Sequence, residues 1–243
     1  MSRPGRLIGV GLGPGDPELM TLKAVKALQA APVVAYFAKA GQKGRARKTA
    51  DGFILPHQKE APLVYPMTTE IAFDDPRYRC ALSAFYAEAA ERLAGYLGEG
   101  EDVALLCEGD PLFFGSFMHV FVRLEQRFRT GIVPGVAAMS GAWSAAALPM
   151  TWGDDALIVL AGTLPRELLV EKLKAADAAV VMKIGRNLER VRSALKEAGM
   201  HERAVYVEYA TMSGQRVQRL AERDDAAAPY FSLILAPGQG RRP

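Results

Sequence analysis

Short apolar runs alternate with longer amphipathic stretches along almost the whole chain. The run at 103–107 reads Val-Ala-Leu-Leu-Cys and is apolar at every position. A strand covered on both faces of a parallel sheet has this composition, whereas a half-exposed strand alternates apolar and polar residues. Runs of this kind predict strands over 7–10, 33–37, 103–107, 131–133, 157–161, 179–184, 204–209 and 230–235.

Apolar residues at helical spacing predict helices between these strands. The first helix is expected to begin with Asp16 as its N-cap and Pro17 in the first helical position, and to bury Leu22, Val25 and Leu28. A second N-cap is expected at Ser116. The other predicted helices cover 78–97, the small-residue stretch up to 147, the stretch from 165 to 176, and 188–198, which ends at a glycine.

The alternation of strands and helices indicates an α/β protein. The chain has 243 residues, enough for one large domain or two small ones. A Pro-Gly pair at 134–135 separates two halves of the chain that differ in their sequence pattern. We therefore expect an N-terminal parallel-sheet α/β domain over 1–136 and a C-terminal mixed-sheet α/β domain over 137–243.

Composition excludes several classes of protein. Two cysteines make no disulfide framework, and three scattered histidines make no zinc cluster, so no metal site is expected. The apolar runs are far shorter than the roughly 20 residues that a membrane-spanning helix needs. No signal peptide is evident at the N-terminus. These features favour a cytoplasmic protein that uses no membrane.

The basic residues are concentrated in one segment. Lysine and arginine exceed aspartate and glutamate by only 30 to 27, yet the stretch 38–50 has no acid and contains Lys39, Lys43, Arg45, Arg47 and Lys48. Such a segment is either a solvated loop or a binding site for an anionic ligand. It lacks interleaved aromatic residues, so nucleic acid is not the expected partner.

Three glycine or proline turns directly follow predicted strands, at 11–16, 109–115 and 134–135. Ligands of open parallel sheets collect at the carboxyl ends of strands. The first turn has the spacing G-x-G-x-G rather than the dinucleotide pattern G-x-G-x-x-G, and Asp16 would repel a pyrophosphate. A nucleotide-dependent oxidoreductase is thus disfavoured. Glu108, directly before the second turn, and Asp110, within it, could accept hydrogen bonds from a ribose or an amine, or could cap the next helix.

The stretches 10–24, 109–115, 134–138, 182–187 and 207–211 resemble, in order, five motifs of the tetrapyrrole methylases. This resemblance spans nearly the whole chain. It implies two α/β domains with a ligand cleft between them, S-adenosyl-L-methionine as cofactor, a small-molecule tetrapyrrole of cobalamin biosynthesis as substrate, and a homodimer. The cofactor residues that it implies are Pro14, Glu108, Gly109, Asp110, Phe113, Ala137, Ala138, Ile184 and Ala210.

The resemblance also implies a reaction in which a methyl group passes to an electron-rich ring carbon. A base for the departing proton could be Tyr36, Glu108 or His119, which could equally be a core residue, a helix cap and a surface residue. Family members that act on uroporphyrinogen typically have an aspartate after the second strand, and 36–39 contains no acid. The closer likeness within the family implies methylation at C20 of the macrocycle, with another ring position as the alternative, and a metal-free macrocycle is favoured over a cobalt-containing one.

The substrate of such an enzyme carries carboxylates on its acetate and propionate arms. Arginine and lysine are suited to hold carboxylates at the mouth of a cleft. We therefore expect the substrate-binding residues to include Asp16, Lys39, Lys43, Arg45, Arg47 and Lys48.

Overall fold

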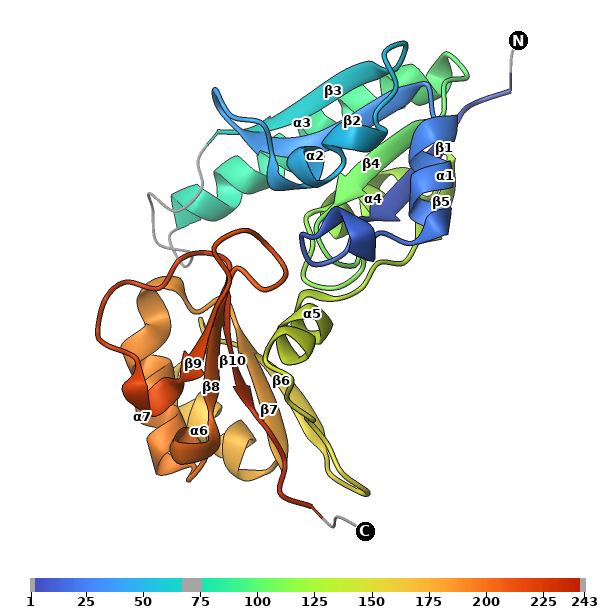
Figure 1. Cartoon of the computed structure of the whole chain (residues 1–243). Helices are drawn as coiled ribbons and strands as arrows, with labels where there is room; N and C mark the ends of the chain where they lie inside the picture. Colours follow the sequence, from blue (N-terminus) through green and yellow to red (C-terminus); the bar gives the residue numbers. More distant parts are fainter. Residues whose placement is uncertain (1–2, 67–75, 241–243) are drawn as a thin grey trace. The chain divides into compact units, whose positions relative to one another are not determined.

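The computed structural model describes residues 3–66 and 76–240. The chain forms two compact units, Met1–Ala138 and Met139–Pro243, which are described here one at a time. The division falls at the start of helix α5 (Ala138–Ala145), close to the break at 136 suggested by the sequence. Figure 1 shows the sheet and helices of each unit.

The first unit is built on a five-stranded sheet in which every neighbouring pair is parallel. Its strand order is β3-β2-β4-β1-β5, so the fully buried β4 lies in the centre. The strands are β1 (Arg6–Gly11), β2 (Val33–Lys39), β3 (Lys59–Tyr65), β4 (Val103–Cys107) and β5 (Arg129–Val133). Strand β3 was not predicted, because Pro62 argues against a central strand; it is tolerated here because β3 is an edge strand.

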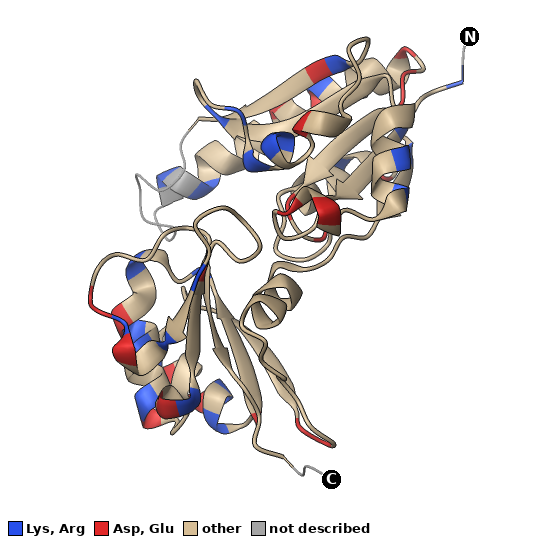
Figure 2. Cartoon of the chain, viewed as in Figure 1, with Lys and Arg blue, Asp and Glu red and all other residues tan. Residues whose placement is uncertain are grey.

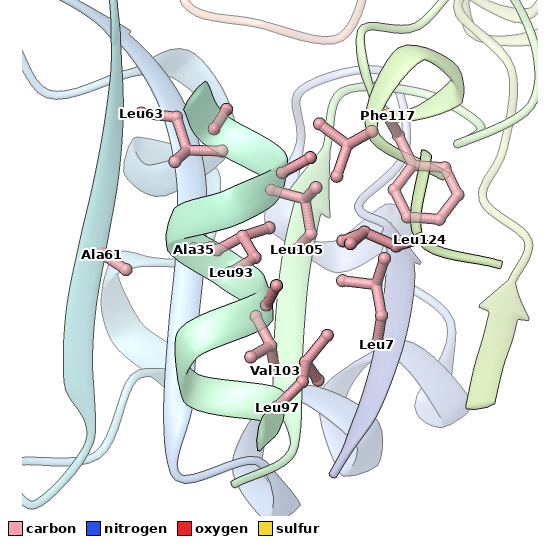
Figure 3. Packing of buried hydrophobic residues seen from close by; sticks show 14 of the residues in the cluster. Leu7, Ala35, Ala61, Leu63, Leu93, Leu97, Val103, Leu105, Phe117 and Leu124 are labelled. Carbon is pink, nitrogen blue, oxygen red and sulfur yellow. The ribbon is translucent and has the colours of Figure 1, made fainter. Parts of the chain in front are cut away.

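Helices cover both faces of this sheet. Helices α1 (Leu22–Ala30) and α2 (Arg45–Thr49) pack on one face, and α3 (Pro76–Gly98) and α4 (Phe117–Leu124) pack on the other. Figure 3 shows Leu93 and Leu97 of α3 against Val103 and Leu105 of β4. All four side chains are completely buried. Each buried aliphatic side chain contributes about 1.5–3 kcal/mol to folding, so this layer fixes the sheet that supports the strand ends.

Local structure at two predicted helix starts differs from expectation. Asp16 caps a separate 3-10 turn at Pro17–Leu19, and the Oγ1 of Thr21 caps α1 by accepting from the Ala24 N–H. The break rotates the helix, and Leu22 is 80% exposed instead of buried. Ser116 makes no capping hydrogen bond to α4; its hydroxyl is used elsewhere, as described below.

The second unit has a mixed five-stranded sheet with the order β6-β7-β10-β8-β9. Strands β6 and β7 are parallel, and β10 is antiparallel to both β7 and β8. The strands are β6 (Leu157–Ala161), β7 (Ala178–Met182), β8 (Val205–Glu208), β9 (Arg216–Arg219) and β10 (Ser232–Ala236). Strand β9 was missed because it is short, polar and at the edge.

Helices α6 (Arg166–Lys174) and α7 (Leu188–Glu197) pack together on one face of this second sheet. Helix α7 ends before Gly199, whose φ of +71° is the left-handed conformation expected of a glycine terminator. In the described ranges, none of the helices is long and apolar enough to cross a membrane. The same ranges contain no group of three or more His, Cys, Asp or Glu side chains placed to hold a metal ion.

Candidate active site

The first two glycine turns are hydrogen-bonded to each other at the carboxyl ends of β1 and β4. The N–H of Gly109 donates to the carbonyl of Gly13 at 2.8 Å, and the N–H of Gly13 donates to the carbonyl of Gly109 at 3.3 Å. The N–H of Leu12 also donates to the carbonyl of Cys107 at 2.9 Å. Because β1 and β4 are parallel neighbours, two motifs nearly a hundred residues apart become one continuous backbone surface.

The third turn, after β5, packs against both of the others. A Cβ atom at Gly135 would lie 2.2 Å from the carbonyl oxygen of Gly109 and 2.9 Å from the Cα of Gly11. A Cβ atom at Gly11 would in turn lie 2.5 Å from the nitrogen of Gly135. Glycine is therefore required at these positions by the close approach of three backbone segments, not only by turn conformation.

Asp110 ties the second turn to the third. One carboxylate oxygen accepts from the Leu112 N–H at 2.9 Å, and the other accepts from the Gly135 N–H at 3.2 Å. A carboxylate has about four lone-pair sites, so both oxygens retain acceptor capacity for a ligand. The next residues include Phe114, a non-glycine residue with a φ of +54°. Strained backbone of this kind clusters at functional sites.

Glu108 lies between the end of β4 and helix α2. Its side chain is exposed to solvent, but protein atoms around its carboxyl partly desolvate it. This desolvation raises the pKa of the carboxyl to about 7, against the lowering effects of the Ala46 N–H, which donates to it, and of the Arg45 charge. A carboxyl with a pKa near neutrality can both accept and release a proton at physiological pH.

Tyr36 belongs to a different polar group, formed with Arg47 and Glu60. The hydroxyl of Tyr36 donates to a Glu60 carboxylate oxygen at 2.8 Å. The guanidinium of Arg47 donates to both oxygens of Glu60 at 2.7 and 2.8 Å, and to Asp51 at 2.5 Å. Burial and Glu60 raise the pKa of the Tyr36 hydroxyl, which opposes a role as proton acceptor.

The Arg47–Glu60 pair leads to a prediction about acid stability. The Arg47 guanidinium holds the pKa of Glu60 at about 2, below its ordinary value of roughly 4.3. A carboxyl with a lowered pKa stabilises the fold above its unfolded pKa, and this contribution is lost as the pH falls toward the folded pKa. We expect the free energy of unfolding to fall less steeply between about pH 5 and about pH 3 in Glu60→Gln than in the wild type. Urea denaturation at both pH values measures this, and equal slopes would contradict the assignment.

The basic segment forms helix α2 and its flanks rather than a loop. Arg47 is 8% exposed at its side chain and occupied by Glu60 and Asp51, so we no longer assign it to the substrate. The side chains of Lys39, Lys43, Arg45 and Lys48 are exposed, and Figure 2 shows the basic residues on α2. Asp16 is half-buried and accepts from the Glu18 N–H at 2.9 Å, which makes it a local capping residue.

His119 lies on the other face of the sheet from Tyr36. It projects from α4 and stacks on the ring of Tyr86 with centroids 4.3 Å apart. Nearby, the Ser116 hydroxyl is hydrogen-bonded to the hydroxyls of Tyr65 at 2.5 Å and Tyr86 at 3.1 Å. The sheet thus separates His119 from the other two candidate bases, whereas Tyr36 and Glu108 both lie on the face that α2 covers. No local pattern in the sequence signals the Tyr65–Ser116–Tyr86 group, because its members come from β3, the turn before α4, and α3.

The fourth and fifth motifs follow strands of the second unit. Ile184 comes after β7 and is fully buried, and Ala210 comes after β8 and is half-buried. Because β10 is antiparallel to both strands, β7 and β8 end at the same edge of their sheet. Their neighbours Lys183, Tyr209 and Thr211 have φ values between +48° and +63°, so both turns are tightly specified.

Of the other expected cofactor residues, Pro14 and Gly109 are buried. Phe113, Ala137 and Ala138 are half-buried. All of them belong to the three joined turns of the first unit or to the start of α5. The structure therefore gathers the sequence-predicted cofactor residues of the first unit around one surface, although their contacts with a cofactor stay a prediction.

A parallel sheet whose glycine turns converge at its carboxyl edge, followed by a mixed-sheet unit, defines a class of two-unit α/β proteins. The family model for Tetrapyrrole (Corrin/Porphyrin) Methylases matches residues 6–224. The chain belongs to this family of methyltransferases.

Individual proteins resemble the chain in sequence or in fold. The chain is 53% identical over 239 residues to precorrin-2 C(20)-methyltransferase of Sinorhizobium sp., covering 98% of both chains. A crystal structure of cobalt precorrin-4 methyltransferase, a cobalamin biosynthetic enzyme, is 24% identical and superposes with a TM-score of 0.74, covering 96% of this chain and 94% of that one. Uroporphyrin-III C-methyl transferase from Thermus thermophilus, complexed with S-adenyl homocysteine, is 25% identical with a TM-score of 0.65, covering 96% and 97%.

Proposed function

We propose that this protein transfers a methyl group from S-adenosyl-L-methionine to C20 of precorrin-2, giving precorrin-3A and S-adenosyl-L-homocysteine in cobalamin biosynthesis. The observation that carries the proposal is the 53% identity, over 98% of both chains, to an enzyme named for that reaction. Family resemblance supports the further proposal of a cytoplasmic homodimer.

The three joined turns fit the methyl donor. A close backbone approach, kept open by Gly11, Gly109 and Gly135, lets a ligand reach main-chain N–H and C=O groups. The remaining acceptor capacity of Asp110 suits a ribose hydroxyl or the ammonium of the methionine part. Pro14 and Phe113 would supply apolar contacts to the donor.

Four further residues are proposed as donor contacts on the resemblance. Ala137 and Ala138 carry no hydroxyl, so they would bind through their backbone groups. Ile184 and Ala210 are proposed because they stand in the fourth and fifth motifs.

The reaction itself requires little chemistry from the protein. The bond between sulfur and the methyl carbon breaks, and an electron pair of the tetrapyrrole forms the new bond from C20 to that carbon. The proton on C20 then leaves. Holding the two reactants in line can supply about 7–11 kcal/mol of the barrier in favourable systems. The protein must therefore chiefly bind, orient and accept one proton.

Among the three candidate bases we assign the proton acceptor to Glu108. Tyr36 already donates its hydroxyl to Glu60, and His119 lies across the sheet from Glu108 and α2. Glu108 stands at the carboxyl end of β4, next to the joined turns, with a pKa of about 7. The exposed side chains of Lys39, Lys43, Arg45 and Lys48 are proposed to bind the substrate carboxylates.

Incubation with precorrin-2 and S-adenosylmethionine carrying a ¹³C-methyl group tests the proposal. We expect carbon NMR to show the label at C20, and no label when the enzyme is omitted. Label at another ring carbon would contradict the proposed position. Transfer only to the cobalt-containing macrocycle would contradict the metal-free substrate.

A further inference from the structure

Every nitrogen group of the Arg47 guanidinium donates to a carboxylate. The guanidinium donates to both oxygens of Glu60 through two nitrogens and to Asp51 through the third, and the Tyr36 hydroxyl donates to Oε2 of Glu60, the oxygen that also accepts from Arg47 Nε. Bidentate pairing of this kind fixes geometry as well as charge. Glu60 and Tyr36 are part of the sheet, on β3 and β2, so Arg47 ties α2 to two neighbouring strands.

Helix α2 depends on such attachments. It has only five residues, and its N-cap, Gly44, provides no side-chain hydrogen bond. A helix this short is not stable by itself in water. At its start the chain presses on β2, because a Cβ atom at Gly44 would lie 1.9 Å from the carbonyl oxygen of Phe37. Ala46 is the other buried residue on α2 itself.

The position of α2 decides where two exposed cations stand. Arg45 and Lys48 project from the helix while Arg47 faces inward. The Ala46 N–H donates a hydrogen bond to the Glu108 carboxyl, and the Arg45 charge lowers the pKa of that carboxyl. Helix α2 therefore also borders the proposed proton acceptor. A shift of α2 would therefore move the cationic groups relative to the carboxyl edge of the sheet.

We propose that Arg47 is a positioning residue, which clamps α2 to Glu60 and Tyr36 so that Arg45 and Lys48 meet the carboxylates of the substrate. Arg47 does not itself contact the substrate. This proposal rests on the proposed function in one respect, that the exposed cations of α2 bind an anionic macrocycle.

A double-mutant cycle tests the clamp, with uroporphyrin, a stable octacarboxylate macrocycle, as the probe and fluorescence as the measure of binding. We expect Arg47→Met and the pair Arg45→Gln with Lys48→Gln each to weaken binding about fivefold, the range for a few partly exposed ion pairs. If Arg47 acts through the other two residues, adding Arg47→Met to that pair weakens binding no further. Equal, additive losses would show that Arg47 acts independently of Arg45 and Lys48 and would overturn the proposal.

Two further variants separate positioning from general stability. Arg192→Met removes another nearly buried, paired arginine, in the second unit, and is expected to leave uroporphyrin affinity unchanged. Arg47→Met combined with Glu60→Gln removes both charges of the clamp, for use where the single variant folds poorly, and is expected to bind like Arg47→Met. Wild-type affinity in a folded Arg47 variant would overturn the proposal.

Failure of the clamp proposal can be distinguished from failure of the proposed function. Label at a ring carbon other than C20 would refute the reaction while the binding cycle still supports the clamp. Unchanged uroporphyrin affinity after loss of Arg45 and Lys48 would show that these two residues do not bind the macrocycle. That result would refute the proposed role of Arg47 even if C20 is methylated.

Discussion

Gly135→Ala is expected to lower the affinity for S-adenosylmethionine by about 100-fold, the equivalent of roughly 2.7 kcal/mol. The added methyl group would lie 2.2 Å from the carbonyl oxygen of Gly109, and backbone atoms of Gly11 lie within 3 Å. No flexible side chain can move aside, so the third turn must separate from the other two. Overpacking of this kind costs about 1–3 kcal/mol. Equilibrium dialysis with labelled S-adenosylmethionine measures the loss.

Gly95→Ala is the matched control for this substitution. Gly95 lies inside α3, and a Cβ atom there would meet nothing within 4 Å. Alanine is favoured over glycine in a helix interior by about 1 kcal/mol, so this variant should be slightly more stable and bind S-adenosylmethionine normally. Normal binding by a folded Gly135→Ala protein would show that the joined turns do not form the cofactor surface.

Glu108→Gln is expected to lower kcat about 100-fold. General-base catalysis contributes typically 10²–10⁴-fold, and glutamine keeps the size of the side chain but cannot accept the proton. With a pKa of about 7, wild-type kcat/KM should rise with pH through neutrality and level off above it. The variant should lose that rise. Initial rates of methyl transfer between about pH 5.5 and about pH 8.5 measure both effects.

The stability of the same variant gives an independent measurement. A carboxyl whose pKa is raised on folding binds more protons in the folded state, so stability falls as the pH rises from its unfolded pKa toward about 7. Glu108→Gln should lack this fall and gain stability relative to wild type at about pH 8. Glu88→Gln, on the exposed side of α3, is the control for loss of one carboxylate. A wild-type pH–rate profile in Glu108→Gln would assign the proton to another group.

Most strands could be predicted because their signal is local. A run such as 103–107 is apolar at each position whatever it pairs with, and the structure makes it the buried centre of a parallel sheet. The three glycine turns were also visible, since each follows such a run. Strand β3 was missed because Pro62 is acceptable only at an edge, and edge position is a property of the assembled sheet.

The exact placement of the first helix shows the limit of local reasoning. Asp16 and Pro17 do form a capped turn, but the chain restarts at Thr21, and this restart exposes Leu22. Two acceptable caps five residues apart compete, and packing against β1 and β5 decides between them. The helical spacing of apolar residues, which predicted that Leu22 is buried, does not indicate which of the two caps begins the helix.

The sequence alone established the α/β class and the order of turns on which the family assignment rests, because these follow from patterns over a few residues. The roles of individual polar groups depended on the folded chain. In the sequence, Arg47 cannot be distinguished from its basic neighbours. In the structure it pairs with Glu60, which lies thirteen positions later on a strand that was not predicted. Glu108 acquired a neutral-range pKa only because folding surrounds it with protein atoms. Pairing and desolvation arise between residues that are distant along the chain, so the tertiary structure had to decide them.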